Sequence, residues 1–275
     1  MVKKIRIGNV ILSTISVFVA LVFLAPFFWS IGVSLQHEGR KIVTVWDWFK
    51  PPYTFENYIN IIFDTAVPNW TFNSLAIAVV ATILTVILSA MAAYAIAKIN
   101  FKGSSLVFFY FLLGLMIPAE ATIVPLFITV NKFQMIDTYA GLILPSIAGS
   151  MNMIIMVTFF KGIPNEVIEA VRIDGGGDMT IFFKILLPLS KAVISTVCIF
   201  AFIGSWNSYL WPLLCSMSQE KFTLPIGIPT FAGTYTIDYV KPVAASMVAS
   251  LPMIIIYIIF ERQIVEGISM SGVKG

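Results

Sequence analysis

The chain has 275 residues, of which 59% are hydrophobic and only 11% are charged, and its formal net charge is +3. Soluble domains carry roughly 25% charged residues, so this composition cannot cover a water-facing surface and excludes an ordinary soluble enzyme. The basic residues are dispersed through short connecting segments and give no sign of a nucleic-acid partner.

Long runs without Asp, Glu, Lys or Arg recur along the chain. About 20 helical residues cross the ~30 Å hydrocarbon layer of a bilayer, and each run has at least 19 residues. The runs are 7–36, 65–97, 138–160, 192–219 and 242–260, with a sixth, 103–131, interrupted only by Glu120. Because barrel strands would be about 10 residues long and would alternate, the runs predict helices.

We therefore predict an all-α integral membrane protein with about six transmembrane helices in the lipid bilayer. The expected spans are 10–35, 72–97, 104–128, 141–160, 191–215 and 241–260.

The basic residues predict the orientation of these spans. Both termini and the connections 98–103 and 161–191 lie on one side and hold eleven Lys and Arg residues, whereas the other connections hold six. Lys and Arg favour the cytoplasmic side of a membrane. We expect a multi-pass protein with both termini in the cytoplasm.

Three regions are expected along the chain: an N-terminal helix with an external segment at 1–70, a transmembrane core at 71–262 with the inward loop 161–190, and a C-terminal tail at 263–275. Much of the external segment is rich in Trp, Tyr and Phe, which suits the headgroup interface of a bilayer.

The longest inward connection, residues 161–191, predicts a helix with two different sides. By helical spacing, Val167, Ile168 and Val171 fall on one side of this helix, and Glu166, Glu169 and Arg172 fall on another. Pro164 suits the start of this helix, and the glycines 175–177 should end it. A second amphipathic stretch, 179–187, leads to Pro188. The prediction is a helix–turn–helix against the membrane with its charged side toward the cytoplasm.

This segment resembles the loop motif of permeases in binding-protein-dependent ABC importers, in which E-A-A is followed after three residues by G and after nine more by I-x-L-P. Here the motif reads Glu169-Ala170-Val171, Gly175 and Ile185-x-Leu187-Pro188, with Val171 in place of the second Ala. Flanking residues at 163–164, 172–175 and 272–275 are similar to the sugar-type, maltose-permease-like members. The similarity extends from about residue 55 to the C-terminus.

The resemblance implies a type I ABC importer permease fold, with an ABC transmembrane type-1 core at 71–262. It implies that the loop docks on a cytoplasmic ATPase through Glu166, Glu169, Ala170, Arg172, Asp174, Gly175, Ile185, Leu187 and Pro188. The implied partners are a second, non-identical permease subunit, two ATPase subunits, an external solute-binding protein and a carbohydrate substrate. The implied location is the cytoplasmic (inner) membrane of a bacterial cell.

The chain itself is not expected to be an enzyme or to hold a cofactor. No Gly-Lys dipeptide occurs, so the P-loop pattern is absent, and ATP and Mg²⁺ would be bound by the ATPase partners. Cys198 and Cys215 lie on one predicted helix about 25 Å apart, beyond disulfide reach. His37 is the single histidine, so no metal cluster is expected.

Four residues are candidates for the translocation path. Glu120 falls about 24 Å along the third predicted span, and a carboxylate at membrane depth is costly and favours a functional role. It equally fits a position at the outer headgroups. Trp206 and Tyr209 share a face of the fifth predicted helix, with Asn207 beside them, and aromatic and amide groups suit sugars. An aromatic belt with a packing Asn is the structural alternative.

The function that follows is a permease subunit of an ATP-driven carbohydrate importer. A glycerol-phosphate or polyol importer of the same type is the alternative, although its substrate would favour Arg or Lys within the spans. An ion-coupled secondary transporter would show broken helices in matching halves and several buried charges, and neither is found. A structural membrane subunit without transport would leave the loop motif without a purpose.

Overall fold

The structure, a computed structural model, describes residues 7–40, 44–99, 101–231 and 239–272. These residues form helices and connecting segments, without a strand among them. Contacts divide the chain into two units, which are treated separately: residues 1–68 with 228–253, and residues 69–227 with 254–275. The predicted region boundaries near residues 70 and 262 stay a prediction, and the end of the expected tail, 273–275, lies outside the described residues.

Candidate membrane spans agree with the predicted number. Three helices are long and apolar enough to cross a bilayer, at Ile11–Ser34, Val67–Lys98 and Val240–Glu261, and the described residues hold up to six spans if each bent helix pair counts as one. The bent pairs are Ser104–Met116 with Ala119–Lys132, Tyr139–Ser146 with Ser150–Gly162, and Asp178–Leu189 with Lys191–Trp206. The prediction of about six spans is therefore confirmed, and three of the spans are bent.

The first unit begins with α1 (Ile7–Ser34), followed by η1 (Val45–Phe49) and α2 (Glu56–Phe63). The end of α1 is fixed by α2, because the Asn57 side-chain amide donates to the carbonyl oxygens of Ser34 (2.9 Å) and Gln36 (2.6 Å). Gly32 lies so close to η1 that a Cβ atom there would be 2.9 Å from the Trp48 carbonyl oxygen.

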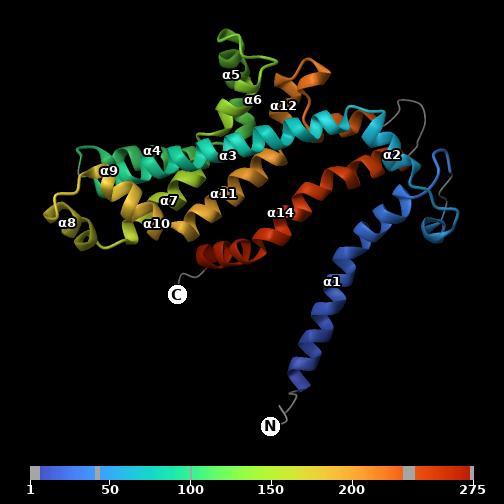
Figure 1. Cartoon of the computed structure of the whole chain (residues 1–275), viewed down its shortest axis with the longest axis horizontal. Helices are drawn as coiled ribbons and strands as arrows, with labels where there is room; N and C mark the ends of the chain where they lie inside the picture. The colour runs from blue at the N-terminus through green and yellow to red at the C-terminus, as the bar shows by residue number, and fades with distance from the viewer. Residues whose placement is uncertain (1–6, 41–43, 100, 232–238, 273–275) are drawn as a thin grey trace. The chain divides into compact units, whose positions relative to one another are not determined.

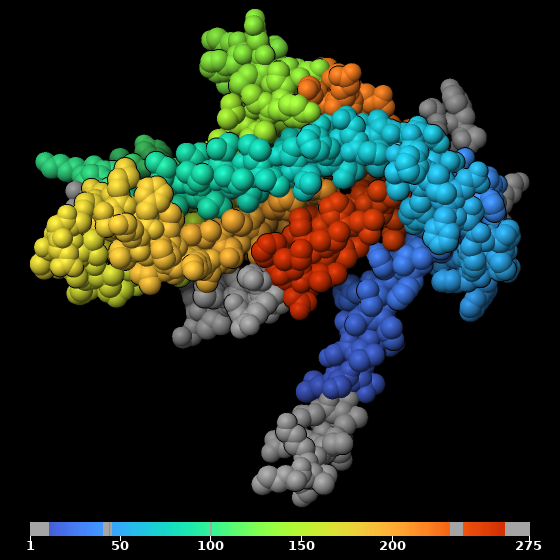
Figure 2. All heavy atoms as spheres, viewed as in Figure 1, coloured from blue at the N-terminus to red at the C-terminus, as the bar shows by residue number. Residues whose placement is uncertain are grey.

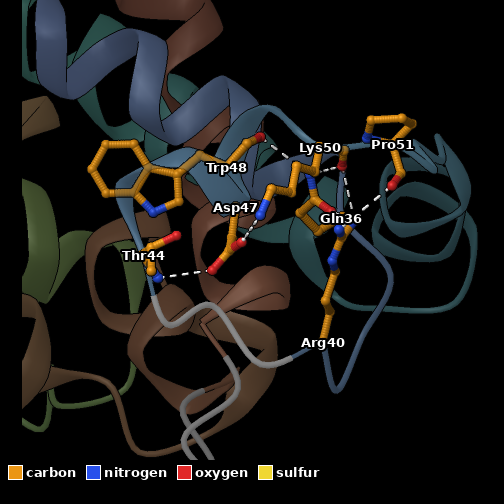
Figure 3. Close-up of polar contacts among 7 residues, drawn as sticks. All are labelled: Gln36, Arg40, Thr44, Asp47, Trp48, Lys50 and Pro51. Carbon is orange, nitrogen blue, oxygen red and sulfur yellow. Dashed lines mark hydrogen bonds and ion pairs between the residues drawn. The ribbon is translucent and has the colours of Figure 1, made fainter.

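Gln36 fixes the path of the segment that follows α1 (Figure 3). Its fully buried amide donates to the carbonyl oxygens of Trp48 (3.2 Å) and Lys50 (3.4 Å). Arg40 donates to the Gln36 side-chain oxygen and to the Lys50 carbonyl oxygen (2.9 Å). A polar side chain without water must find partners, and here those bonds give the 36–51 segment a defined path.

The second unit is built along α3 (Val67–Lys98), which Figure 1 shows running beside α11 with α7 and α4 near one end. The other elements are α4 (Ser104–Met116), α5 (Ala119–Lys132), α6 (Tyr139–Ile143), η2 (Leu144–Ser146), α7 (Ser150–Gly162), α8 (Asn165–Ile173), α9 (Asp178–Thr180), the π-helix η3 (Ile181–Leu186), α10 (Leu187–Leu189), α11 (Lys191–Trp206), α12 (Leu210–Cys215), η4 (Gln219–Lys221) and α13 (Leu224–Gly227). After η5 (Ile228–Phe231), α14 (Val240–Gly272) continues well beyond the predicted end at residue 260.

The third predicted span, 104–128, is not one straight helix. It breaks between α4 and α5, whose axes meet at 106°. Pro118 has no N–H and disfavours helical geometry at the preceding residue, and Ile117 is accordingly extended, with φ −88° and ψ 118°. Glu120 therefore lies in the first turn of α5, exposed, and the depth counted along a continuous helix was wrong.

The fifth predicted span, 191–215, is also divided. α11 ends at Trp206, and α12 begins at Leu210. Pro212 explains the break, because inside a continuous helix it would remove a hydrogen bond and clash with the carbonyl of Ser208. Cys198 and Cys215 consequently lie on different helices, and both are free.

Two apolar clusters pack along α3. One surrounds the end of this helix, where Ala93 and Ile96 meet Val157 and Phe160 of α7 and Leu186 of η3. The other, nearer its beginning, consists of Ile77, Val130, Leu142 and Cys215. α3 therefore joins the loop after α7 to the region of α6 and α12.

Candidate docking loop and membrane cavity

The segment 161–190, termed the docking loop from here, has one buried side and one exposed side. Ile163 and Ile168 belong to the apolar cluster at the end of α3, whereas Glu166, Glu169 and Arg172 of α8 are exposed. The predicted two-sided helix is confirmed, except that Val167 is 37% exposed. Pro164 is the N-cap residue directly before α8, where a missing N–H costs nothing.

The glycines end α8, as predicted. Gly175 has φ +79°, a left-handed conformation that suits glycine. Its N–H donates to the Arg172 carbonyl (3.0 Å), and the Gly176 N–H donates to the Val171 carbonyl (2.8 Å). This pair of bonds is a Schellman motif, and it reverses the chain before α9.

Two polar anchors tie the docking loop to the last turn of α3. Lys98 Nζ donates to the carbonyl oxygen of Ile163 (2.5 Å) and to Asn165 Oδ1 (2.8 Å). Tyr94 OH donates to Asp178 Oδ1 (2.8 Å), which also pairs with Arg172 Nη2 (3.2 Å). Because Tyr94 and Lys98 are four residues apart, they lie on one side of α3, and they hold the start of α8 and the start of α9.

The second half of the docking loop packs inward. Ile181, Phe182 and Leu186 are buried in the cluster at the end of α3. Leu187 donates its N–H to the Phe182 carbonyl five residues earlier, and the next residue, Pro188, has no N–H to donate. The second half of the docking loop is therefore packed into the apolar cluster at the end of α3.

The residues proposed for docking fall into two groups. The first half of the docking loop presents a row of exposed residues, which are Glu166, Glu169, Ala170, Arg172, Asp174 and Gly175. In its second half, Ile185 and Leu187 are half-buried, and Pro188 is exposed. Ile173 and Met179 are apolar side chains of the same loop that are 85% and 73% exposed. Figure 2 shows the loop, in yellow, on the surface at one end of this unit.

The four residues proposed for the translocation path do not share one helix face. Trp206 is buried and stacks on Phe202, with ring centroids 5.8 Å apart. Asn207 caps α11, and Tyr209 precedes α12, so the shared helical face expected for Trp206 and Tyr209 was wrong. Their role in a path, and that of Glu120, stays a prediction.

A cavity of about 330 Å³ lies within the second unit, and none of those four residues lines it. One side of it is formed by residues of α3 at helical spacing, which are Ser74, Ile77, Ala81 and Thr85. The facing residues of α11 and the turn after it are Ala201, Gly204, Ser205 and Ser208. Asn152 of α7, Trp211 of α12 and Thr223 also line it.

Sequence reasoning missed the cavity, although a signal was present. Ser74, Ala81 and Thr85 recur on one face of α3, and Ala201, Gly204 and Ser205 recur on one face of α11. Small and hydroxyl residues at this spacing mark close or polar helix contacts in membranes. The pattern does not say whether two such faces touch or leave a space between them.

Membrane-spanning helices, a loop whose charged side is exposed and a cavity among the helices together characterise a membrane-embedded transport subunit. The family model described as "Binding-protein-dependent transport system inner membrane component" matches residues 85–269, more than half of the chain. The chain belongs to this family.

Curated relatives carry names of the same kind. The chain is 38% identical over 224 residues to the arabinooligosaccharides transport system permease protein AraQ of Halalkalibacterium halodurans, with 81% of this chain and 80% of the relative covered. It is 33% identical over 256 residues to the diacetylchitobiose uptake system permease protein NgcG of Streptomyces coelicolor, with 92% and 84% covered.

A solved structure shows the same fold. A chain in the crystal structure of a bacterial ABC transporter involved in the import of the acidic polysaccharide alginate matches with a TM-score of 0.82. The match covers 95% of this chain and 98% of the other at 20% identity. The predicted type I importer permease fold is therefore confirmed.

Proposed function

We propose that this chain is a permease subunit of an ATP-driven carbohydrate importer in a bacterial cytoplasmic membrane. It would form half of the translocation path and transmit the motion of a cytoplasmic ATPase to its helices. The observation that carries the proposal is the docking loop, whose charged side is exposed while its base is anchored to α3 at Lys98 and Tyr94.

The geometry of the loop supports a mechanical role. A loop that only covered the ends of the helices would not need hydrogen bonds that fix its position relative to α3. Here Lys98 holds Ile163 and Asn165, and Asp178 joins Arg172 to Tyr94. A force applied to α8 therefore reaches α3, which borders the cavity along residues 74–85.

The exposed side of the docking loop carries both charged and apolar residues that a protein partner could contact. Glu169 and Arg172 present both signs of charge beside the exposed Ile173, and protein interfaces combine apolar contacts with a polar rim. We assign this surface to a cytoplasmic ATPase subunit, which would bind ATP and Mg²⁺. The remaining partners would be a second ATPase subunit, a second, non-identical permease subunit and an external solute-binding protein.

The carbohydrate substrate is proposed from the relatives, whose names refer to arabinooligosaccharides and diacetylchitobiose. Family membership gives no support to an ion-coupled secondary transporter. It also supplies the transport role that a purely structural subunit would lack.

The test is charge reversal at Glu169 in the assembled complex. Glu169→Lys should leave membrane insertion and complex yield unchanged, because the side chain is exposed. It should reduce substrate-stimulated ATP hydrolysis at least tenfold, since a misplaced charge at an interface costs several kcal/mol.

The matched control is Glu56→Lys, which reverses an exposed glutamate in the first turn of α2 in the other unit and should hydrolyse ATP normally. Full stimulation in Glu169→Lys would overturn the docking assignment.

A further inference from the structure

The cavity between α3 and α11 is separate from the docking loop, and polar uncharged side chains form part of its lining. Hydroxyl and amide side chains face it from several elements, including Ser74, Asn152, Ser205 and Ser208. From this lining we propose that the cavity binds one unit of a neutral, hydroxyl-rich ligand, a sugar of the transported carbohydrate. The proposal rests on the proposed function and names the substrate class and its contacts in this chain.

Thr223 carries the strongest indication of a ligand. It lines the cavity, is 5% exposed, and its Oγ1 has no hydrogen-bond partner among the described residues. A buried hydroxyl without a partner costs about 1–3 kcal/mol, so such groups are rare unless something else binds them. Ser74 Oγ accepts from the Leu224 N–H at 2.8 Å, which orients this hydroxyl and leaves its own O–H as a donor.

The cavity selects against charge. Among the described residues, none that lines the cavity is Asp, Glu, Lys, Arg or His, so a phosphate ester or a carboxylate sugar would enter without a counter-charge. Burying an unpaired anion costs far more than burying a hydroxyl that finds partners. A neutral sugar, whose hydroxyls both donate and accept, matches the Ser, Thr and Asn side chains.

Trp211 supplies the apolar part of the site. Its Nε1 donates to the Gly141 carbonyl at 3.0 Å, so the ring is fixed in place and its polar edge is occupied. The C–H face of a sugar ring can then pack on an aromatic surface without competing for that bond. The volume of about 330 Å³ lies at the lower end of the ~300–1,000 Å³ typical of small-molecule sites, which suits a small saccharide.

The test measures binding at the cavity directly, in the assembled transporter complex and without ATP. In a background lacking Cys198 and Cys215, Ser208→Cys provides a thiol in the lining, and its rate of modification by a methanethiosulfonate reagent is measured. The probes are arabinotriose, N,N′-diacetylchitobiose and trehalose as neutral sugars, with glucuronic acid and glycerol 3-phosphate as anions. At least one neutral sugar should slow the modification, and neither anion should.

Adding Thr223→Val should raise the protecting sugar concentration about fivefold, the effect of one lost neutral hydrogen bond. Thermal stability should stay equal or rise, because an unpaired hydroxyl is removed. Thr196→Val is the matched control: it deletes a buried hydroxyl of α11 that bonds the Ala192 carbonyl and should leave protection unchanged. Glu220→Cys places a thiol at an exposed position outside the cavity, and this thiol should react at a rate independent of sugar.

Equal protection in Thr223→Val and its parent would overturn the assignment of Thr223 as a sugar contact, and no protection of the parent Ser208→Cys by any neutral sugar would leave the cavity as a water-filled space. Protection by an anion would overturn the neutral-ligand assignment. If neutral sugars are transported yet none protects Ser208→Cys, the cavity site fails alone. If none is transported or bound, the carbohydrate function fails with it.

Discussion

Asp137 joins two connections that are distant in sequence. Its Oδ1 accepts from the N–H groups of Ser218 (3.0 Å) and Met217 (2.9 Å) and from the Ser218 hydroxyl (3.0 Å). The Ser218 N–H is the main cause that lowers the pKa of Asp137, and Met217 and the nearby Lys221 act in the same direction. The ionised carboxylate thus holds the turn before α6 to the turn after α12.

This site predicts a pH-dependent stability. Since the pKa of Asp137 is lower in the folded state, its contribution is present above the unfolded-state value of about 3.9 and is lost as pH falls through the folded value. Asp137→Asn should lower the melting temperature of the complex at pH 7 by about 2–4 °C, corresponding to about 1 kcal/mol. The difference should narrow below about pH 4.

Scanning calorimetry at pH 7 and near pH 3, below the unfolded-state pKa of about 3.9, checks this expectation, with Asp64→Asn at an exposed site as the control that should not shift. A deficit that is equal at both pH values would mean that the charge is not what stabilises the turn.

The docking loop shows how an element is shaped by a single backbone conformation. Gly175 ends α8 with φ +79°, and the chain then turns so that Asp178 reaches Tyr94. A β-branched side chain at Gly175 opposes that conformation. The turn, rather than the charges alone, therefore sets where α8 stands relative to α3.

Two glycines in this turn allow a matched test. A Cβ at Gly175 or at Gly177 meets no atom within 4 Å, so neither substitution causes a clash, but Gly177 has φ −85°. Gly175→Val should cost about 1–2 kcal/mol of loop stability and reduce substrate-stimulated ATP hydrolysis severalfold.

Gly177→Val should be much closer to wild type in the same assay, with complex yield measured for both. Equal losses would indicate that side-chain bulk at the partner interface matters, and not the left-handed turn.

At the scale of the second unit, α3 separates two connections. Near its start, Asn73 donates to the Glu220 carbonyl (2.7 Å), and at its end Lys98 donates to the Ile163 carbonyl. Twenty-five helical residues rise about 38 Å, more than the ~30 Å hydrocarbon layer. The docking loop and the segment at 219–221 should therefore face opposite sides of the membrane.

The distribution of basic residues assigns the docking loop to the cytoplasm. In a background without Cys198 and Cys215, a membrane-impermeant maleimide should label Glu220→Cys in intact cells. It should label Lys184→Cys, also exposed, only after permeabilisation. Labelling of both thiols from outside would contradict the predicted orientation, and the parent without cysteines controls for background.

Composition and periodicity were sufficient for the class of protein, the number of spans and the docking loop. The uncharged runs predict spans because the bilayer penalises charge wherever it occurs along a helix. The two sides of α8 and its glycine end follow from local spacing, so Ile168 and Gly175 could be assigned without knowledge of their neighbours. The family motif added the expectation of a partner that no local pattern contains.

Only the tertiary structure showed how the spans bend and what they enclose. Pro118 and Pro212 mark possible breaks in the helices, but packing decides whether a proline bends a span or ends it. Because the spans break at these two prolines, Glu120, Trp206 and Tyr209 do not lie where continuous helices would place them. The cavity, and the lack of a partner for the Thr223 hydroxyl among the described residues, depend on side chains from helices far apart in sequence. Periodicity describes one helix at a time, and a space between helices is a property of their arrangement.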